Sequence, residues 1–366
     1  MRLLWLELAD FRSYHALRFE PAEGVNILLG PNGAGKTNLL EGVGFLASTR
    51  SFRSAPEQAL IAHGADSAVI RAEVERGSSV SLLEFELSAA GRRRVLVNRQ
   101  RLARLTDLLG YLRAIPFLPE DLDIVKGGPG VRRQILDEVA VQLWPAAGLD
   151  QHEFERALKQ RNAFLRQSRR EGADQATLEV WDVRVSQAGG RVMERRASVV
   201  RALQTEWGQC YSSIAGRDSE VTVSYQSSWG GEIDPAVGGD QFATRLLGAL
   251  TACRRADLER GQTTSGPHRD EPRFSLDGHD SRFHASQGEQ RALALSLRLA
   301  AHQAVTVAAG SPPVLLLDDV FSELDPDRSE RLVGALPPAQ TLITSARPED
   351  VPISGHRWRV MPGLIS

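Results

Sequence analysis

The sequence has few cysteines, few lysines and no long uninterrupted apolar segment. Its two cysteines, Cys210 and Cys253, lie far apart and lack the spacing of metal ligands, which suits a reducing cytoplasm. Charged residues interrupt the N-terminus before a signal-peptide core forms, and no apolar run reaches membrane-spanning length. The formal net charge of −2 excludes a global attraction to nucleic acid, so any DNA binding must use local patches. We therefore expect a cytoplasmic protein without a membrane partner.

One of the rare lysines stands in a phosphate-binding pattern. Only three of the 44 basic residues are lysines, and Lys36 belongs to the pattern G-x-x-x-x-G-K-[ST] at residues 30–37. The apolar run at 25–29 predicts a buried parallel strand before the loop, and residues 37–46 predict a helix after it. Strand, loop and helix therefore follow in the order that a phosphate-binding loop requires.

The loop residues predict binding of ATP together with Mg²⁺. Glycines let successive backbone N–H groups point at a phosphate, and the start of the helix adds partial positive charge. Lys36 is expected to reach the β- and γ-phosphates, and the Thr37 hydroxyl is expected to bind Mg²⁺. The residues expected to contact the nucleotide here are Gly30, Asn32, Gly33, Ala34, Gly35, Lys36, Thr37 and Asn38.

A second apolar run supplies the carboxylates of such a site. Residues 314–317 are apolar and end in Asp318 and Asp319, the Walker B arrangement. Asp318 is expected to hold Mg²⁺, and Asp319 is expected to orient or deprotonate the attacking water. Alone this pattern is weak, but together with the phosphate-binding loop it predicts an ATP site.

A third motif precedes an apolar helix expected at 290–308. Ser286 and Gly288 lie about thirty residues before Asp318, where ATP-binding-cassette proteins carry the signature that contacts the γ-phosphate held by a second subunit. The run from Ser322 to Asp325 matches the D-loop of that class. Ser286 is equally typical of a helix N-cap, with Glu289 completing a capping box. The signature interpretation predicts a head-to-tail dimer with two nucleotides between the protomers.

The other segments predict an antiparallel sheet and a short helical arm. Strands are expected at 68–74, 80–87 and 92–98. Helices of about 15 to 30 residues are expected at 131–143, 154–170, 178–207 and 241–260, with a turn at 172–174. A loop is expected at 227–240 and a hairpin with strands at 274–276 and 282–283. The run from Arg92 to Arg94 is more typical of a solvated strand end than of a DNA contact.

These motifs together resemble the bacterial RecF recombination-repair family, relatives of the Rad50 and SMC heads. The stretches that carry the resemblance run in family order over most of the chain. They are residues 30–38, 117–122, 126–129 with Arg132 and Arg133, 264–270, 286–291 and 317–325. As a set they are far more specific than the phosphate-binding loop alone.

The resemblance implies an α/β fold: an ABC-type P-loop ATPase head with an inserted, mainly helical arm. The head would comprise residues 1–125 and 262–366, and the arm residues 126–261. It also implies an ATP-dependent homodimer on DNA, at gaps and at junctions of single-stranded and duplex DNA, that loads recombinase with RecR and RecO. The family roles are recombination, DNA repair, replication restart and the SOS response to DNA damage.

The same resemblance implies a role for each site residue. Lys36 and Thr37 would contact phosphate and Mg²⁺, Asp318 would be the second Mg²⁺ ligand, and Asp319 would be the catalytic carboxylate. Ser286 and Gly288 would contact the γ-phosphate held by the other protomer. Arg12 matches a position near the nucleotide in related heads. His268 to Asp270 is either functional or a polar turn. Cassette ATPases usually have Glu where this chain has Asp319, and Thr344 to Arg347 replaces the expected switch histidine. These departures imply slow hydrolysis in a clamp or switch, not a metabolic enzyme or nuclease.

Two other classes share the head motifs. An ABC transporter subunit needs a membrane partner, and the helical insert is foreign to it. An SMC-like structural protein needs hundreds of coiled-coil residues, which this chain lacks.

Overall fold

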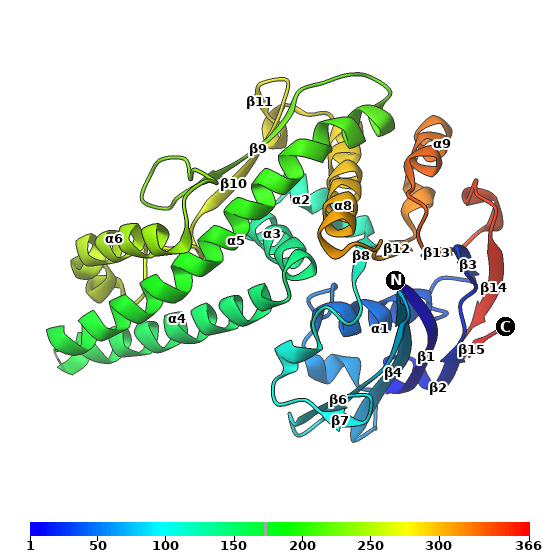
Figure 1. Cartoon of the computed structure of the whole chain (residues 1–366), viewed down its shortest axis with the longest axis horizontal. Coiled ribbons are helices and arrows are strands. Elements are labelled where there is room, and N and C mark those ends of the chain that lie inside the picture. Colours follow the sequence, from blue (N-terminus) through cyan, green and yellow to red (C-terminus); the bar gives the residue numbers. More distant parts are fainter. Residues whose placement is uncertain (172–173) are drawn as a thin grey trace. The chain divides into compact units, whose positions relative to one another are not determined.

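The computed structural model describes residues 1–171 and 174–366, so part of the turn predicted at 172–174 lies outside the described residues (Figure 1). Two compact units make up the described chain. The first contains Met1–Asp121, Gln209–Asp218 and Arg291–Ser366, and the second contains Leu122–Gly208 and Ser219–Gln290. Helices α5 (Gln175–Ala215) and α8 (Gln287–Ala309) contribute residues to both units.

One sheet of the first unit is antiparallel throughout. Its strands are, in spatial order, β2 (Tyr14–Phe19), β1 (Arg2–Phe11), β4 (Ser67–Arg76), β5 (Ser79–Ser88), β6 (Arg93–Val97) and β7 (Gln100–Arg101). Every second residue of β4 is buried, and so is every second residue of β5 from Leu83 onward, as the pleat of a sheet with one covered face requires. The predicted strands at 68–74, 80–87 and 92–98 are therefore confirmed.

The other sheet of the first unit is mainly parallel. Its order is β15 (Leu364–Ile365), β14 (His356–Met361), β3 (Val25–Leu29), β13 (Thr341–Ser345), β12 (Val314–Asp318) and β8 (Ala114–Phe117). Only the β14–β15 pair is antiparallel. The register places Asp318 opposite Thr344, and Thr344 opposite Leu28. The carboxyl ends of three neighbouring strands thus meet at one edge.

Helix α1 (Lys36–Ser48) lies between the two sheets. A Cβ on Gly42 would approach Leu8 of β1 to 2.9 Å, and one on Gly44 would lie 3.7 Å from Leu316 of β12. The Phe45 ring packs edge-on against Phe85 of β5 with centroids 4.9 Å apart. Burial on both sides holds the helix, and with it the phosphate-binding loop at its start.

The second unit is mainly helical. It contains α2 (Leu122–Lys126), α3 (Pro129–Leu143), α4 (Ala146–Glu171), most of α5, α6 (Gly239–Arg260) and α7 (Ser281–His284). A three-stranded antiparallel sheet completes it, in the order β11 (His279–Asp280), β10 (Glu271–Leu276) and β9 (Val221–Gln226). In the first unit, α9 (Pro326–Ala335) follows β12 through the 3-10 turn η4 (Val320–Glu323).

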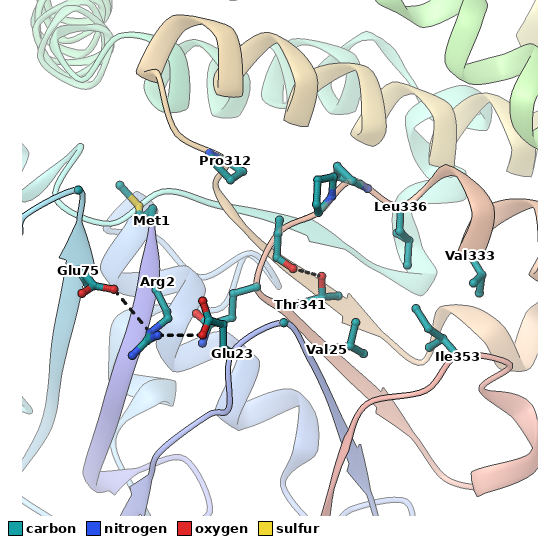
Figure 2. A pocket seen from close by; sticks show the side chains of 16 residues that line it. Met1, Arg2, Glu23, Val25, Glu75, Pro312, Val333, Leu336, Thr341 and Ile353 are labelled. Atoms are coloured by element: carbon teal, nitrogen blue, oxygen red, sulfur yellow. Dashed lines mark hydrogen bonds and ion pairs between the residues drawn. The ribbon is translucent and has the colours of Figure 1, made fainter.

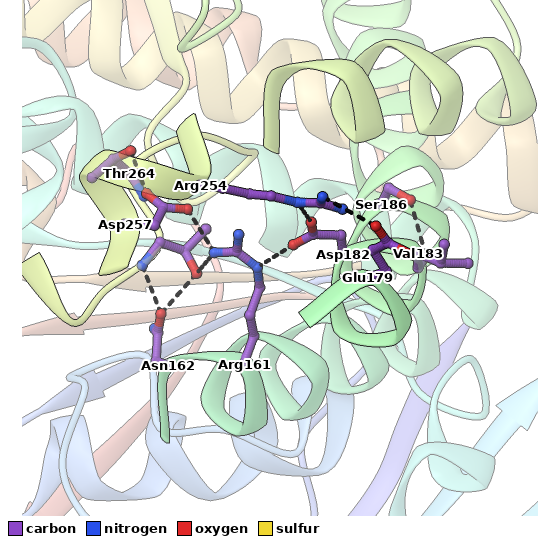
Figure 3. A network of polar contacts seen from close by, with 10 residues as sticks. Arg161, Asn162, Glu179, Asp182, Val183, Ser186, Arg254, Asp257 and Thr264 are labelled. Carbon is purple, nitrogen blue, oxygen red and sulfur yellow. Dashed lines mark hydrogen bonds and ion pairs between the residues drawn. The ribbon is translucent and has the colours of Figure 1, made fainter. Parts of the chain in front are cut away.

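A buried ionic network joins three helices of the second unit (Figure 3). Arg161 of α4 donates to Asp182 of α5 at 2.8 Å and to Asp257 of α6 at 2.7 Å, and all three side chains are fully buried. Arg254 of α6 also donates to Asp182 at 2.7 Å. Because isolated charges are costly to bury, these groups fix how the three helices pack.

Two sequence predictions about these elements are wrong. Residues 282–283, expected as a strand, belong to the short helix α7, because the Asp280 side chain accepts the N–H of Arg282 and caps it. The helices of the arm were expected to be at most about 30 residues long, whereas α5 has 41 residues. Strands β9 and β14 were not expected from the sequence.

Candidate functional site

The phosphate-binding loop has the backbone that its glycines predict. Gly33 and Gly35 have φ angles of 82° and 105°, in a region that residues with a side chain avoid. A Cβ on Gly30 would lie 2.2 Å from the carbonyl oxygen of Val360, so no larger residue fits there. Asn32 is exposed at the loop, whereas Ala34 is buried and its N–H bonds to the Pro31 carbonyl at 3.2 Å.

Lys36 folds back over this loop. Its Nζ donates to the carbonyl oxygens of Gly30 at 2.6 Å and of Pro31 at 3.0 Å. Burial lowers the pKa of Lys36, and the charges of Asp319 and Asp318 oppose that shift. A cation held next to a loop whose backbone N–H groups point inward is suited to bind phosphate oxygens.

The turn between β1 and β2 contacts one face of α1. The Arg12 guanidinium donates two 2.8 Å bonds to the carboxylate of Glu41, which is fully buried. Ser51 donates to the same carboxylate at 2.5 Å, and Arg12 also donates to the Ala59 carbonyl at 2.8 Å. Arg12, expected near the nucleotide, is therefore held against the second turn of α1.

The next two residues of that turn contact the start of the same helix. Asn38 donates to the Ser13 hydroxyl at 2.8 Å. The Tyr14 hydroxyl would lie 2.8 Å from a Cβ on Gly35. Burial raises the pKa of Tyr14 to about 12, so the phenol stays neutral. Residues 35, 38 and 41 lie three apart on one helix face, so a single hairpin turn buttresses the loop and the helix.

The side chains of Thr37 and Asp318, the two residues expected to bind Mg²⁺, are in contact. The Thr37 hydroxyl donates to Asp318 Oδ1 at 2.9 Å, and the Thr344 hydroxyl donates to the same oxygen at 2.7 Å. Burial raises the pKa of Asp318, and the two hydroxyl bonds partly offset the shift. The charges of Asp319 and Glu120 raise it further. The site therefore concentrates negative charge that a cation would neutralise.

Asp319 follows in a strained backbone conformation. Its φ of 51° is left-handed, and its N–H donates to the Thr344 hydroxyl at 2.9 Å. Its Oδ1 is buried and has no hydrogen-bond partner in the described part of the chain. This unpartnered oxygen follows Asp318 in sequence, and Asp318 is in contact with the Thr37 hydroxyl. Carboxylate and hydroxyl oxygens are the ligands that Mg²⁺ prefers. The residues present therefore fit Mg²⁺.

Protein side chains alone do not complete a metal shell. Among residues 1–171 and 174–366, no group of three or more His, Cys, Asp or Glu is placed to hold a metal ion. Mg²⁺ usually keeps one or two carboxylates and takes its other ligands from substrate phosphates and water. Thr37 and Asp318 would hold the ion together with the nucleotide.

The signature region has the geometry of a helix cap. The Ser286 N–H donates to Glu289 at 2.7 Å, and the Glu289 N–H donates to the Ser286 hydroxyl at 3.3 Å. This reciprocal pair is a capping box at the start of α8. Ser286 is exposed and Gly288 is half-buried, so the cap leaves the helix N-terminus open to an external anion.

The D-loop is tied to the start of α8 within the first unit. Arg291 of α8 donates to the Glu323 carboxylate at 2.9 Å and also to its carbonyl oxygen. Ser322 donates to the Asp319 carbonyl at 2.8 Å. The segment after Asp319 is thus fixed to α8 at Arg291.

Thr344 is a site residue that the sequence argument did not select. It stands where a switch histidine was expected, at the end of β13, and is fully buried. Its hydroxyl contacts both Asp318 and the backbone of Asp319. The sequence signal was limited to its position at the end of an apolar strand-like run, and its register with Asp318 comes from the structure.

The segment from His268 to Asp270 forms a buried turn. His268 Nε2 contacts the Thr263 carbonyl at 3.1 Å, and burial lowers its pKa to about 4. Asp270 accepts the Tyr225 hydroxyl at 2.8 Å, and burial raises its pKa. Only Arg269 of the three is exposed. These bonds favour a structural turn over a catalytic group.

A pocket of about 540 Å³ in the first unit lies away from this chemistry (Figure 2). It opens at Val25 and Thr341, the first residues of β3 and β13, whereas the phosphate-binding loop and Asp318 lie at the opposite ends of the strands. On one side of the pocket, Arg2 forms an ion pair with Glu23 (N–O distance 3.5 Å) and another with Glu75 (3.7 Å).

Helix α8 is long and apolar enough to cross a membrane by length and composition. However, 67% of its most apolar window is buried. Core helices of water-soluble proteins have the same properties, so this helix is weak support for a membrane span.

Sequence comparison identifies the family of the chain. Residues 2–358 match the family described as the RecF/RecN/SMC N terminal domain. The chain belongs to this family. A relative from Streptomyces avermitilis, the "DNA replication and repair protein RecF", is 39% identical and is aligned over 100% of this chain and 99% of its own length.

Structural comparison gives the same assignment. A solved structure of "the recombination mediator protein RecF-ATPrS in RecFOR pathway" superposes with a TM-score of 0.91 at 29% identity, covering 100% of this chain and 97% of the other. An SMC head bound to the C-winged helix domain of ScpA has a TM-score of 0.58 at 14% identity, covering 100% and 96%, and shows the fold alone. The expected ABC-type head fold of the RecF and SMC proteins is therefore confirmed.

Proposed function

We propose that this chain is an ATP-dependent, DNA-binding recombination mediator of the RecF type. The observation that carries the proposal is the convergence of Lys36, Thr37 and Asp318 at the carboxyl edge of the parallel sheet. This geometry is suited to hold the phosphates of ATP. The RecF relative and the RecF–nucleotide structure support both the ligand and the role in DNA repair.

Nucleotide binding uses residues of one protomer. Lys36 neutralises the phosphates, while the backbone N–H groups around Gly33 and Gly35 surround them. Mg²⁺, held by Thr37 and Asp318, would neutralise charge on the β- and γ-phosphates. Asp319 aligns or deprotonates the attacking water, and Arg12 acts near the nucleotide. The shorter reach of Asp than of Glu favours slow hydrolysis, as in a timed clamp.

Dimerisation would complete the site. Ser286 and Gly288 lie at the exposed start of α8, where a helix N-terminus favours an anion such as the γ-phosphate held by a second protomer. By two-fold symmetry the contact is made twice. The homodimer would assemble on DNA at gaps or junctions and act with RecR and RecO in the cytoplasm, in repair, replication restart and the SOS response. In this proposal the head spans 1–125 and 262–366, and the arm 126–261.

Light scattering with ATP and DNA tests the dimer. Ser286→Asp keeps a good N-cap but places an anion where the partner's phosphate would lie, so the variant should bind ATP and stay monomeric. Asp319→Asn keeps Asp318 and should give a longer-lived dimer. Ser213→Asp, at an exposed serine of α5, adds the same charge elsewhere and should dimerise normally.

Two results would contradict the proposal. Normal ATP-dependent dimerisation of Ser286→Asp would leave Ser286 as a helix cap only. Wild-type protein that binds neither ATP nor gapped DNA would remove the recombination-mediator function itself. A transporter subunit or an SMC-like structural protein is less well supported, because the relative at 39% identity and the structure at 29% identity are RecF proteins, whereas the SMC head is only 14% identical.

A further inference from the structure

The hairpin of β6 and β7 concentrates positive charge at one edge of the antiparallel sheet. Six of the thirteen residues from 92 to 104 are arginines, and none is acidic, in a chain whose net charge is −2. Strand β7 is the last strand of that sheet (Figure 1). The six arginines are Arg92, Arg93, Arg94, Arg99, Arg101 and Arg104.

The hairpin is a defined structure that presents these side chains. Val95 and Val97 are buried in the core and fix the strand register. Asn98 and Arg99 form the tight turn with φ angles of 50° and 66°. The backbone N–H of Asn98 donates to the Leu82 carbonyl at 2.8 Å, and its side chain accepts the Leu82 N–H at 2.9 Å. The turn is therefore anchored to the neighbouring strand β5.

Most of the charge has no counter-ion. Arg93 pairs with Glu57 at 2.7 Å and Arg104 pairs with Asp107 at 3.1 Å. Within residues 1–171 and 174–366, the other four side chains make no ion pair, and all four are exposed: Arg92, Arg94, Arg99 and Arg101. Glu86 lies opposite Arg94 in the β5–β6 register and offsets part of that one charge.

Protection of a sheet edge is a weaker explanation. Charged side chains on edge strands do block pairing with other chains. However, β7 has only two residues and is already too short to template another strand. Three of the six arginines, Arg92, Arg99 and Arg104, lie outside both strands, so protection of a strand edge does not account for them.

We propose that this arginine hairpin, residues 92–104, binds the phosphate backbone of duplex DNA. The inference rests on the proposed DNA-binding function and assigns it a surface. Arginines pair well with phosphates, and a basic patch on a weakly acidic protein is the electrostatic footprint of such contacts. No aromatic residue lies between Phe85 and Tyr111, so the hairpin lacks a platform for stacking single-stranded bases. Backbone contact with a duplex therefore fits it better than base contact with a single strand.

The salt dependence of DNA binding tests this surface. Affinity of the full-length protein for a labelled duplex is measured with ATP by fluorescence anisotropy over a series of KCl concentrations. Arg99→Ala/Arg101→Ala should lower the affinity at least about tenfold at moderate salt and reduce the slope of log K against log salt by about 2. Arg101→Ala alone should reduce the slope by about 1.

A matched control is available in the other sheet. Arg357 is also an exposed arginine on a strand, β14, so Arg357→Ala removes the same charge elsewhere and should leave the slope unchanged. Thermal stability and ATP binding should stay at wild-type values in all variants, because the replaced side chains are exposed.

The outcomes separate the two proposals. If the wild-type protein does not bind duplex DNA, the DNA-binding function fails. If it binds and the double variant binds with the same affinity and slope, the function stands and the hairpin assignment is wrong. An equal loss in Arg357→Ala would also overturn the assignment, because the effect would then be one of total charge.

Discussion

Thr37 Oγ1 and Asp318 Oδ1 lie 2.9 Å apart although 281 positions separate the two residues in the sequence. The contact joins the start of α1 to the end of β12. It places the hydroxyl of the phosphate-binding loop and the Walker B carboxylate where one cation could contact both. Thr344 donates to the same carboxylate oxygen and fixes it from the neighbouring strand.

Removing the Thr344 hydroxyl should impair the proposed metal site. Thr344→Val keeps the shape but leaves Asp318 without one donor and the Asp319 N–H without its acceptor. We expect ATP hydrolysis to fall about tenfold to a hundredfold and half-maximal nucleotide binding to need more Mg²⁺. Thr344→Ser should restore both. Thr341→Val, at the other end of the same strand, is the control. Unchanged Mg²⁺ dependence in Thr344→Val would exclude this role.

Replacing Lys36 should weaken nucleotide binding directly. Lys36→Met removes the cation closest to the phosphates, so ATP affinity should drop at least about tenfold and ATP-dependent dimerisation should be lost. Lys36→Arg should bind nucleotide but hydrolyse it poorly, because the wider guanidinium does not fit the same position. Lys159→Met, at an exposed lysine, is the control. Isothermal titration calorimetry measures ATP affinity, and an ATPase assay measures the hydrolysis rate. Equal hydrolysis rates in Lys36→Met and wild type would contradict the assignment.

Protonation of His302 should destabilise the first unit in acid. The side chain is 1% exposed, its Nε2 contacts the Pro313 carbonyl at 3.1 Å, and burial lowers its pKa from 6.5 to about 4. Because the unfolded state binds the proton more tightly, stability is full above pH 6.5 and falls as the pH drops toward 4. At about 1.4 kcal/mol per pKa unit, the loss is about 3 kcal/mol.

His302→Gln keeps an N–H donor but does not titrate. Urea denaturation from pH 7 to pH 4 should therefore show a smaller decrease in the free energy of unfolding than in wild type. Burial also lowers the pKa of His268 to about 4, so some acid sensitivity remains. His15→Gln, at an exposed histidine, should follow the wild-type curve. A His302→Gln curve parallel to wild type would refute the linkage.

Breaking the buried network of the second unit should be costly. Arg161→Met leaves the carboxylates of Asp182 and Asp257 buried with less compensation, and the expected loss is about 3–5 kcal/mol in the free energy of unfolding. Arg255→Met, which removes an exposed pair with Glu259, should change stability little. Urea denaturation compares the two. Equal stability of the two variants would show that the network contributes little.

The sequence by itself determined the phosphate-binding loop, the strand before it, the Walker B strand and three strands of the antiparallel sheet, β4, β5 and β6. These features are local: apolar runs of strand length, and glycines where the backbone needs φ angles such as the 105° of Gly35. The capping box at Ser286 is also local, because its two hydrogen bonds span three residues. Local patterns suffice where the interacting groups are close in the chain.

Only the tertiary structure decided which distant residues meet. Strand order placed β13 beside β12 and brought Thr344 to Asp318, a contact that depends on hydrogen bonding between strands and not on any local pattern. The packing of α1 against the turn after β1 paired Arg12 with the buried Glu41. Among the described residues, Arg99 and Arg101 are left without a counter-ion at a sheet edge. Charge alone does not tell a solvated arginine from a paired one, because pairing is set by which strands and helices pack together.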